Sequence, residues 1–219
     1  MDEQQKHALS SKSNRRWWLM FLLLAGAAVL VVGTLGVDAV IGTRIKSNPS
    51  ASNAPNLLVG DYFTVNTRAY KNHGPLRGDL VVFKLPGDAN VEFLERVIGL
   101  PGDKIQIKGG VVFINGDEIS RIRLEDYQDG RGEVFKQYSE RFPDGRAYAT
   151  LDLEIDGPGD NSPEYVVPDR HYFVMGDNRD RSLDSRNQRV GYVPRKNLTA
   201  RAGFVLYARD FSRIGLTLN

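Results

Sequence analysis

The sequence contains no cysteine, and this absence removes several kinds of chemistry at once. Disulfides, cysteine-ligated zinc, iron–sulfur clusters and thiol catalysis are excluded. Histidine is scarce as well: the three residues are His7, His73 and His171, far apart in the chain and without an HExxH motif. A histidine-based metal site is therefore not expected, and we predict no metal and no other cofactor.

Two further absences concern nucleotides and nucleic acids. The chain has no GxGxxG motif and no P-loop, which argues against nucleotide chemistry. Its 29 basic and 27 acidic residues leave a net charge of +2, so no excess of positive charge indicates a nucleic-acid partner. Apolar residues make up 41% of the 219 and charged residues 26%, a composition typical of a folded globular protein.

Charge is also missing from one long stretch, residues 17–37. At about 1.5 Å per residue a helix of this length measures roughly 31 Å, the thickness of a bilayer's hydrocarbon core. Trp17 and Trp18 stand at its start, where indole rings favour the membrane interface. A cleaved signal peptide is the alternative, but the apolar run is longer than such peptides usually have. The pattern predicts a transmembrane helix over residues 17–37.

Basic residues are more numerous before the predicted span than after it, which places the tail 1–16 in the cytoplasm. They are Lys6, Lys12, Arg15 and Arg16 on one side, and Arg44 and Lys46 on the other. The remaining domain, residues 45–219, is then expected on the outer face of the membrane.

The outer domain has the pattern of a mainly β protein. Short runs of β-branched and aromatic residues are separated by Pro-Gly, Gly-Gly and Asn-Gly turns, and Asn115-Gly116 is a strong two-residue hairpin signal. Residues 118–168 are less periodic and are interpreted as an insertion or small second lobe. With no long amphipathic helix, a β-barrel or sandwich is the expected class. The predicted strands are 79–83, 93–98, 104–107, 111–114, 171–175 and 199–207.

Three clusters could carry chemistry, and the first and third have plain alternatives. Residues 48–63 (NPSASNAPNLLVGDYF) contain two prolines around small residues, so we expect an extended segment; a polar linker is the alternative. Residues 77–105 include the apolar strand FLERVIG. Residues 175–186 (MGDNRDRSLDSR) alternate acids with bases, which favours an ion-pair network over a solvated loop, and their spacing does not match a calcium loop.

In order along the chain, these motifs resemble bacterial signal peptidase I, a membrane serine endopeptidase. The resemblance runs from the span to about residue 207. It implies an all-β catalytic domain that cleaves signal peptides from exported proteins after small-x-small sites, using a serine nucleophile and a neutral lysine base. The motifs that carry it are PSAS…P..LLVGDY, RGDLVVFKLP, RVIGLPGDKI and GDNRDRSLDSR…GYVP.

The resemblance also implies roles for individual residues. Ser52 matches the nucleophile, Ser50 the hydroxyl of the oxyanion hole, and Ser182 the hydroxyl that orients the base. The charged frame that surrounds this site in the family is matched here by Asp177, Arg179, Asp184 and Arg186. The lysine base, however, should stand directly before RVIGLPGD, where this chain has Glu95. Further departures from the family pattern are Asn48, Asn53 and Asn56.

Glu95 changes the chemistry that can be expected. By strand alternation it shares a face with Phe93 and Val97, whereas Arg96 points the other way. A carboxylate has an unperturbed pKa near 4.3 and is a weak base for an alcohol, although burial would raise that pKa. Its side chain is shorter than that of lysine, so contact with Ser52 would require backbone movement. Neither Lys84, Lys104 nor His171 is marked as a replacement base.

Two functions therefore stay open. One is a membrane-anchored signal peptidase I with an altered base; the other is a catalytically silent relative that binds peptides or acts as an assembly partner. A β-domain without a peptide function is made improbable by the motifs. The resemblance implies signal peptides of exported pre-proteins and the lipid bilayer as partners, and a single-pass protein of the bacterial cytoplasmic membrane. The sequence gives no indication of oligomeric state.

Overall fold

The computed structural model describes residues 17, 20, 23–24, 42–153 and 156–218. The chain divides into two compact units, residues 1–43 and 44–219. Most of the predicted span, 17–37, lies outside the described residues, although Trp17, Met20, Leu23 and Leu24 are helical and exposed. Among the residues that are described, no helix has both the length and the hydropathy needed to cross a membrane.

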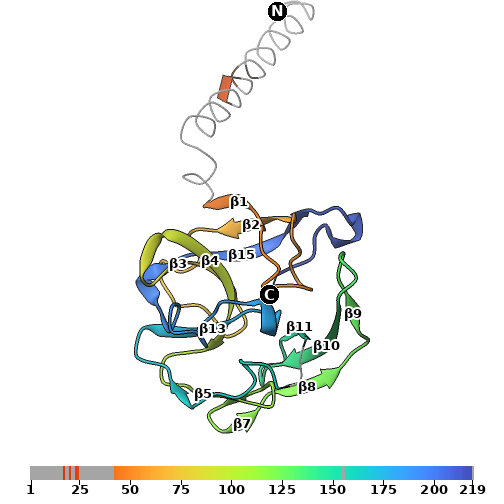
Figure 1. Cartoon of the computed structure of the whole chain (residues 1–219). Helices are drawn as coiled ribbons and strands as arrows, with labels where there is room; N and C mark the ends of the chain where they lie inside the picture. Colours follow the sequence, from red (N-terminus) through yellow and green to blue (C-terminus); the bar gives the residue numbers. More distant parts are fainter. Residues whose placement is uncertain (1–16, 18–19, 21–22, 25–41, 154–155, 219) are drawn as a thin grey trace, which may run out of the picture. The chain divides into compact units, whose positions relative to one another are not determined.

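The unit formed by residues 44–219 is mainly β, as the sequence predicts, and its largest sheet has seven strands (Figure 1). The strand order is β1–β2–β15–β3–β4–β13–β14, and β3 pairs antiparallel with both β4 and β15. The strand bounds are β1 Thr43–Ser47, β2 Tyr62–Asn66, β3 Leu80–Leu85, β4 Asp88–Gly99, β13 His171–Met175, β14 Val193–Pro194 and β15 Leu198–Tyr207.

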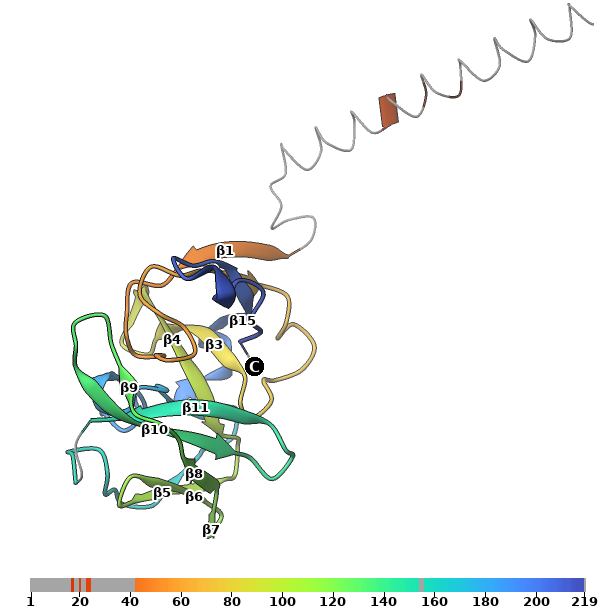
Figure 2. The same ribbon diagram turned by 90° about the vertical axis from the view of Figure 1, so that its right-hand side faces the viewer.

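Two smaller sheets complete the unit, and Figure 2 shows β9, β10 and β11 side by side. One has the order β11–β10–β8, with β9 paired to β10, and the other has the order β12–β5–β6–β7. Their bounds are β5 Lys104–Lys108, β6 Val111–Ile114, β7 Asp117–Glu118, β8 Ser120–Arg123, β9 Tyr127–Gln128, β10 Val134–Arg141, β11 Ala147–Asp152 and β12 Tyr165–Val166. Three short 3-10 helices are η1 Arg179–Arg181, η2 Arg195–Asn197 and η3 Phe211–Arg213.

All six predicted strands are present, with ends that move by a few residues, and the hairpin prediction is confirmed. Asn115 and Gly116 join β6 to β7 and have φ values of 57° and 93°. Both angles are positive, as a tight two-residue hairpin turn requires, and asparagine and glycine tolerate this conformation best. The segment 118–168, predicted as an insertion or lobe, forms β8 to β12 and belongs to the compact unit 44–219.

Strand β4 passes through the middle of the large sheet, and this position sets the site. From Glu95 to Gly99 every residue is buried, because β3 and β13 flank the strand. The face that carries Phe93 and Val97 packs in one apolar cluster with Val81 and Phe83 of β3. Val81 lies directly opposite Glu95 in the register. The acid predicted to share an apolar face therefore does so.

Candidate active site

The serine-bearing loop follows β1, and it turns where the sequence predicted an extended segment. Residues 52–56 form turns instead. The reason is Asn48, whose buried side-chain amide donates to the carbonyl oxygens of Ser50, Leu57 and Leu58 at 2.8, 3.3 and 3.0 Å. These bonds draw the two ends of the loop together and close it over the sheet.

Ser52 is held at both its backbone and its side chain. Its N–H donates to the Ser50 hydroxyl at 3.1 Å, and its carbonyl oxygen accepts from the Asn178 N–H at 2.8 Å. The Ser52 hydroxyl oxygen accepts from Asn53 Nδ2 at 3.1 Å, and the same amide donates to the Leu94 carbonyl at 2.6 Å. Asn53, which replaces an apolar residue of the family pattern, thus ties Ser52 to the strand that carries Glu95.

Glu95 is 1% exposed and lies close to Ser52. Burial raises the pKa of its carboxyl well above the usual value, and the charges of Asp184 and Asp177 raise it further. The Ser182 and Ser52 hydroxyls lie near enough to lower that pKa in part. The carboxyl of Glu95 therefore lies close to the Ser52 hydroxyl despite the short side chain.

Two buried oxygen atoms lack a hydrogen-bond partner among the described residues. They are Oε2 of the Glu95 carboxyl and Oγ of Ser182. No ion pair of Glu95 occurs in the described part of the chain either, although both nearby aspartates have one. A buried carboxyl without a cation favours its neutral, protonated form. Glu95 therefore holds its proton to higher pH than an exposed glutamate does.

The predicted charged frame is present, and each acid in it has an arginine. Asp184 accepts from Arg186 Nε at 2.9 Å and from the Gly176 N–H at 3.0 Å. Arg179 donates from Nη2 to Glu140 at 2.6 Å, and both side chains are almost fully buried. Residues 175–186 do take part in an ion-pair network. Among the described residues, the pair of Asp184 with Arg186 lies within the segment, but three other ion pairs reach outside it.

Sequence reasoning missed three partners of this frame. Arg96 forms a buried ion pair with Asp177, Glu140 pairs with Arg179, and Asn56 donates to Asp177 at 2.8 Å. For Arg96 the sequence contained an indication of an ion pair, because a charged residue in an apolar strand needs a partner of opposite charge. Asn56 stood out only as a departure from the family pattern, and Glu140, in the less periodic segment 118–168, gave no signal.

Gly176 allows the frame to approach the serine loop. A Cβ at this position would lie 2.3 Å from Ser182 Cβ and 2.8 Å from the Ser52 carbonyl oxygen. Real side chains do not come that close, so glycine is the residue that lets the two segments meet. Ser182, expected to orient the base, lies beside Glu95 as a result.

A groove of about 460 Å³ opens over this site. Ser50, Ser52 and Glu95 line it, so the structure brings together three predicted site residues. The arginines and aspartates of the charged frame are not among the lining residues, whereas Arg181 is. Its lining includes residues 46–50 and residues 91–95.

The other basic or nucleophilic candidates lie elsewhere. Lys84 is exposed, and Lys104 pairs with Glu164 on the surface at 3.4 Å. His171 is half-buried and its Nδ1 contacts the Asp169 carbonyl oxygen at 2.8 Å. None of these residues lines the groove.

One acidic group could hold a metal ion. Asp152, Asp160 and Asp180 offer carboxylate oxygens that lie within 4.8 Å of one another. Burial raises the pKa of Asp160, and the charges of the other two add to the rise. Arg121 already neutralises part of the charge through a 2.8 Å bond to Asp152. The group comes from three separate segments, so no sequence motif indicated it.

Comparison with known proteins gives a consistent result. The family model described as "Signal peptidase, peptidase S26" matches residues 15–207. Signal peptidase I of Rickettsia prowazekii is 42% identical over 140 residues, covering 61% of this chain and 53% of the relative. Signal peptidase I of Rickettsia canadensis is 39% identical over 140 residues, covering 61% and 52%.

The chain thus spans about half the length of these relatives. Among solved structures, the crystal structure of a signal peptidase I from Enterococcus faecalis is 27% identical, with a TM-score of 0.35 over 58% of this chain and 95% of that one.

Proposed function

Because the chain belongs to the signal peptidase family, peptidase S26, we propose that it is a serine endopeptidase that removes signal peptides from exported proteins. The observation that carries this proposal is the pairing of Ser52 with the buried carboxyl of Glu95 in one groove. In this reading, Ser52 is the nucleophile and Glu95 takes the place of the family's lysine base.

The chemistry requires Glu95 to be ionised before reaction. The carboxylate accepts the proton of the Ser52 hydroxyl while the oxygen attacks the scissile carbonyl carbon. The protonated carboxyl then gives that proton to the leaving amine. In deacylation, Glu95 accepts a proton from the attacking water and returns it to Ser52. Proton and charge balance in both half-reactions.

The raised pKa makes a carboxyl more useful as this base. A base is most effective when its pKa lies near the working pH, and an ordinary glutamate lies far below it. Burial, together with the charges of Asp184 and Asp177, raises the pKa of Glu95 well above the ordinary value of a glutamate, in the direction that makes it a stronger base. Cleavage should therefore increase with pH as Glu95 loses its proton, and it should fall in acid.

The oxyanion hole requires one rearrangement. The Ser52 N–H donates to the Ser50 hydroxyl at 3.1 Å. When a substrate carbonyl enters, its oxygen takes that N–H, and the Ser50 hydroxyl turns to donate a second bond. Ser50 is exposed, so its hydroxyl has room to rotate. The substrate lies extended between residues 46–50 and 91–95.

An apolar surface on β2, β15 and η3 supports a position at the membrane. Tyr62, Tyr207, Phe204, Phe211 and Ile214 are all exposed, at 46, 49, 43, 72 and 45%. The surface of a soluble monomeric protein rarely exposes so many large apolar side chains together. In this proposal, residues 17–37 span the bacterial cytoplasmic membrane with the N-terminus inside, and the β domain rests on the outer face.

A second function is favoured by the surroundings of Ser52. A protonated Glu95 accepts no proton, so it could not activate Ser52. If the protonated form dominates at working pH, the chain binds signal peptides in the groove without cleaving them. It would then act as a membrane-tethered peptide-binding or assembly protein.

Cleavage of a pre-protein by the full chain in detergent separates the two functions. The peptidase proposal expects cleavage at a small-x-small site that rises with pH and disappears in Ser52→Ala. If the native chain cleaves nothing at any pH while binding a signal peptide, the second function stands instead. Glu95→Lys restores the family base, so Ser52-dependent cleavage that appears only in this variant would show an intact groove. Glu118→Lys, on exposed β7, is the matched control.

A further inference from the structure

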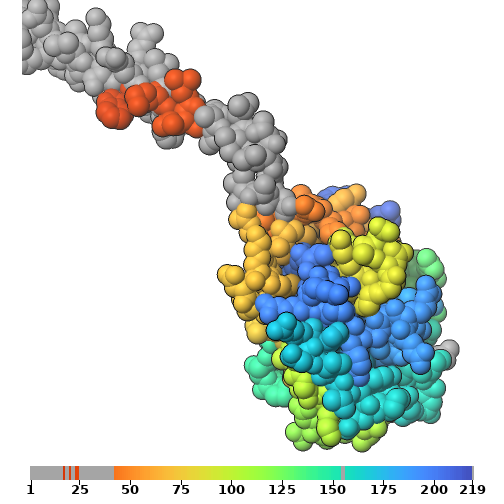
Figure 3. All heavy atoms as spheres, turned by 90° about the vertical axis from the view of Figure 1, so that its left-hand side faces the viewer, coloured from red at the N-terminus to blue at the C-terminus, as the bar shows by residue number. Residues whose placement is uncertain are grey.

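A second cavity, unconnected with catalysis, lies on another part of the β domain. It has a volume of about 680 Å³ and shares no lining residue with the serine groove. Three segments form it: the loop after β2, the start of β13, and β14 with η2 and the start of β15. On the face shown in Figure 3, the gold, cyan and blue parts of the chain that contain these segments adjoin.

The lining of this cavity is strongly cationic. Its charged residues are Lys71, Arg170, Arg195 and Lys196; no aspartate or glutamate lines it. The chain as a whole is almost neutral, at +2, so this concentration is local. In the described part of the chain, Arg170 alone among these four has an ion pair, with Asp169 at 3.8 Å, and both side chains are largely exposed. An exposed pair of this kind neutralises little charge.

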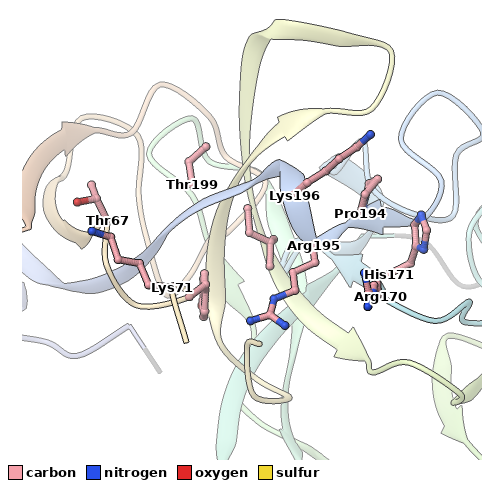
Figure 4. A pocket seen from close by; sticks show the side chains of 10 residues that line it. Thr67, Lys71, Arg170, His171, Pro194, Arg195, Lys196 and Thr199 are labelled. Carbon is pink, nitrogen blue, oxygen red and sulfur yellow. The ribbon is translucent and has the colours of Figure 1, made fainter. Parts of the chain in front are cut away.

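The cations surround the cavity and do not converge on one point. Figure 4 shows Lys71 on one side and Arg170 with His171 on the other, with Arg195 and Lys196 between them. Lys196 extends away from Arg195 in this view. This arrangement favours a ligand with several negative groups over a single small anion.

Hydrogen bonds and apolar contacts join the segments that line the cavity. The Arg195 N–H donates to the Arg170 carbonyl oxygen at 2.8 Å, and His171 pairs with Pro194 across β13 and β14. Tyr70 forms part of the lining and donates its hydroxyl to Asp79 at 3.1 Å. Tyr70 and Leu198 also pack against the apolar core of the domain. The charged side chains therefore extend from backbone segments that are held by these bonds and contacts, and apolar side chains lie between them.

We propose that this cavity binds a ligand that carries two or more phosphate groups. Phosphate matches the arginine and lysine donors, and several groups are needed to reach cations on opposite sides. The volume suits an organic ligand of moderate size. The apolar surface from Tyr70, Leu198 and Pro194 would contact its carbon skeleton. Such phosphates occur in soluble polyphosphates and in the headgroups of lipids with two phosphates.

The test uses the full chain in detergent micelles and two probes, tripolyphosphate and cardiolipin. Calorimetry measures tripolyphosphate binding, and native mass spectrometry counts bound cardiolipin against phosphatidylcholine. We expect tripolyphosphate to bind at low ionic strength, and the double variant Lys71→Glu/Arg195→Glu to weaken binding at least tenfold. The control Lys136→Glu/Arg209→Glu makes the same change in net charge elsewhere and should leave binding unchanged.

The outcomes distinguish the sources of phosphate and can overturn the proposal. Cardiolipin bound in preference to phosphatidylcholine and displaced by tripolyphosphate identifies a lipid headgroup. Tripolyphosphate binding without cardiolipin retention identifies a soluble ligand. Absence of binding to both probes, or equal weakening by the two double variants, rejects the site. Circular dichroism and cleavage or peptide binding at the serine groove verify that the variants remain folded.

Discussion

Arg96 and Asp177 form a two-bond ion pair inside the β domain, with Nε to Oδ1 and Nη2 to Oδ2 both at 2.7 Å. Each side chain is 1% exposed. The third nitrogen of the Arg96 guanidinium, Nη1, donates to the Gly78 carbonyl oxygen at 2.8 Å. Glu95, the residue before Arg96 in β4, points to the opposite face and has no ion pair among the described residues. Burial raises the pKa of Glu95, and the negative charges of Asp184 and Asp177 raise it further.

Replacing Arg96 by methionine should strongly destabilise the domain. The substitution retains most of the side-chain volume but leaves Asp177 buried without its partner, which typically costs about 3–5 kcal/mol. The melting temperature of the full chain should fall by roughly 10 °C or more. Arg96→Met/Asp177→Leu removes both charges and should recover much of the loss. A single variant as stable as the native chain would contradict the importance of this pair.

Replacing Glu95 by glutamine should stabilise the chain at neutral pH. In the unfolded chain a glutamate loses its proton near pH 4.3, whereas burial keeps the proton on Glu95 to higher pH. The carboxyl of Glu95 therefore does not reduce the free energy of unfolding below that pH. As the pH rises toward the folded pKa of Glu95, the free energy of unfolding falls. Glutamine carries no such penalty, so the melting temperature of Glu95→Gln should exceed that of the native chain by a few degrees at pH 8.

At pH 4 the same two proteins should melt at nearly the same temperature. Glu92 provides a control of opposite sign, because its hydrogen bond to Lys46 lowers the pKa of the Glu92 carboxyl. Glu92→Gln should therefore lose stability at neutral pH. If Glu95→Gln gave a pH-independent shift, the inference that the buried carboxyl is protonated would be wrong.

The sequence was informative wherever local pattern determines structure. The hydrophobic runs identified the six strands, and Asn115-Gly116 identified a hairpin, because turn chemistry and alternation act over a few residues. The motif at 175–186 likewise indicated an ion-pair network. The position of Glu95 on an apolar face followed from alternation alone.

What the sequence could not supply depends on contacts between distant segments. Asn53 reaches the Leu94 carbonyl across 41 positions, and Arg96 reaches Asp177 across 81. These bonds depend on the register of β4 with its neighbours and on the path of the serine loop. Asn48 determines that path through three carbonyl oxygens, and a composition-based expectation of an extended segment could not include it.

Asn53 should assist cleavage if the chain is a peptidase. Its amide donates to the Ser52 hydroxyl oxygen, which leaves the hydroxyl proton free to turn toward Glu95. Asn53→Leu removes this bond at similar volume, and losing one neutral hydrogen bond should lower kcat about tenfold with little change in KM. Asn197→Leu removes an exposed amide bond to the Lys84 carbonyl oxygen and serves as control. Faster cleavage by Asn53→Leu would mean that Asn53 restrains the nucleophile.

Gly176→Ala should disturb the site more than its small size suggests. The added Cβ would meet Ser182 at 2.3 Å and the Ser52 carbonyl oxygen at 2.8 Å, so the serine loop and the GDN segment must separate. Overpacking of this kind costs about 1–3 kcal/mol, and the separation should weaken both signal-peptide binding and any Ser52-dependent cleavage. Thermal unfolding and peptide binding measure the two effects. At Gly130 a Cβ would meet nothing within 4 Å, so Gly130→Ala should change neither. If Gly176→Ala also left thermal unfolding and peptide binding unchanged, the close approach of these segments would not be required for the site. The serine loop could then move away without loss of stability or binding.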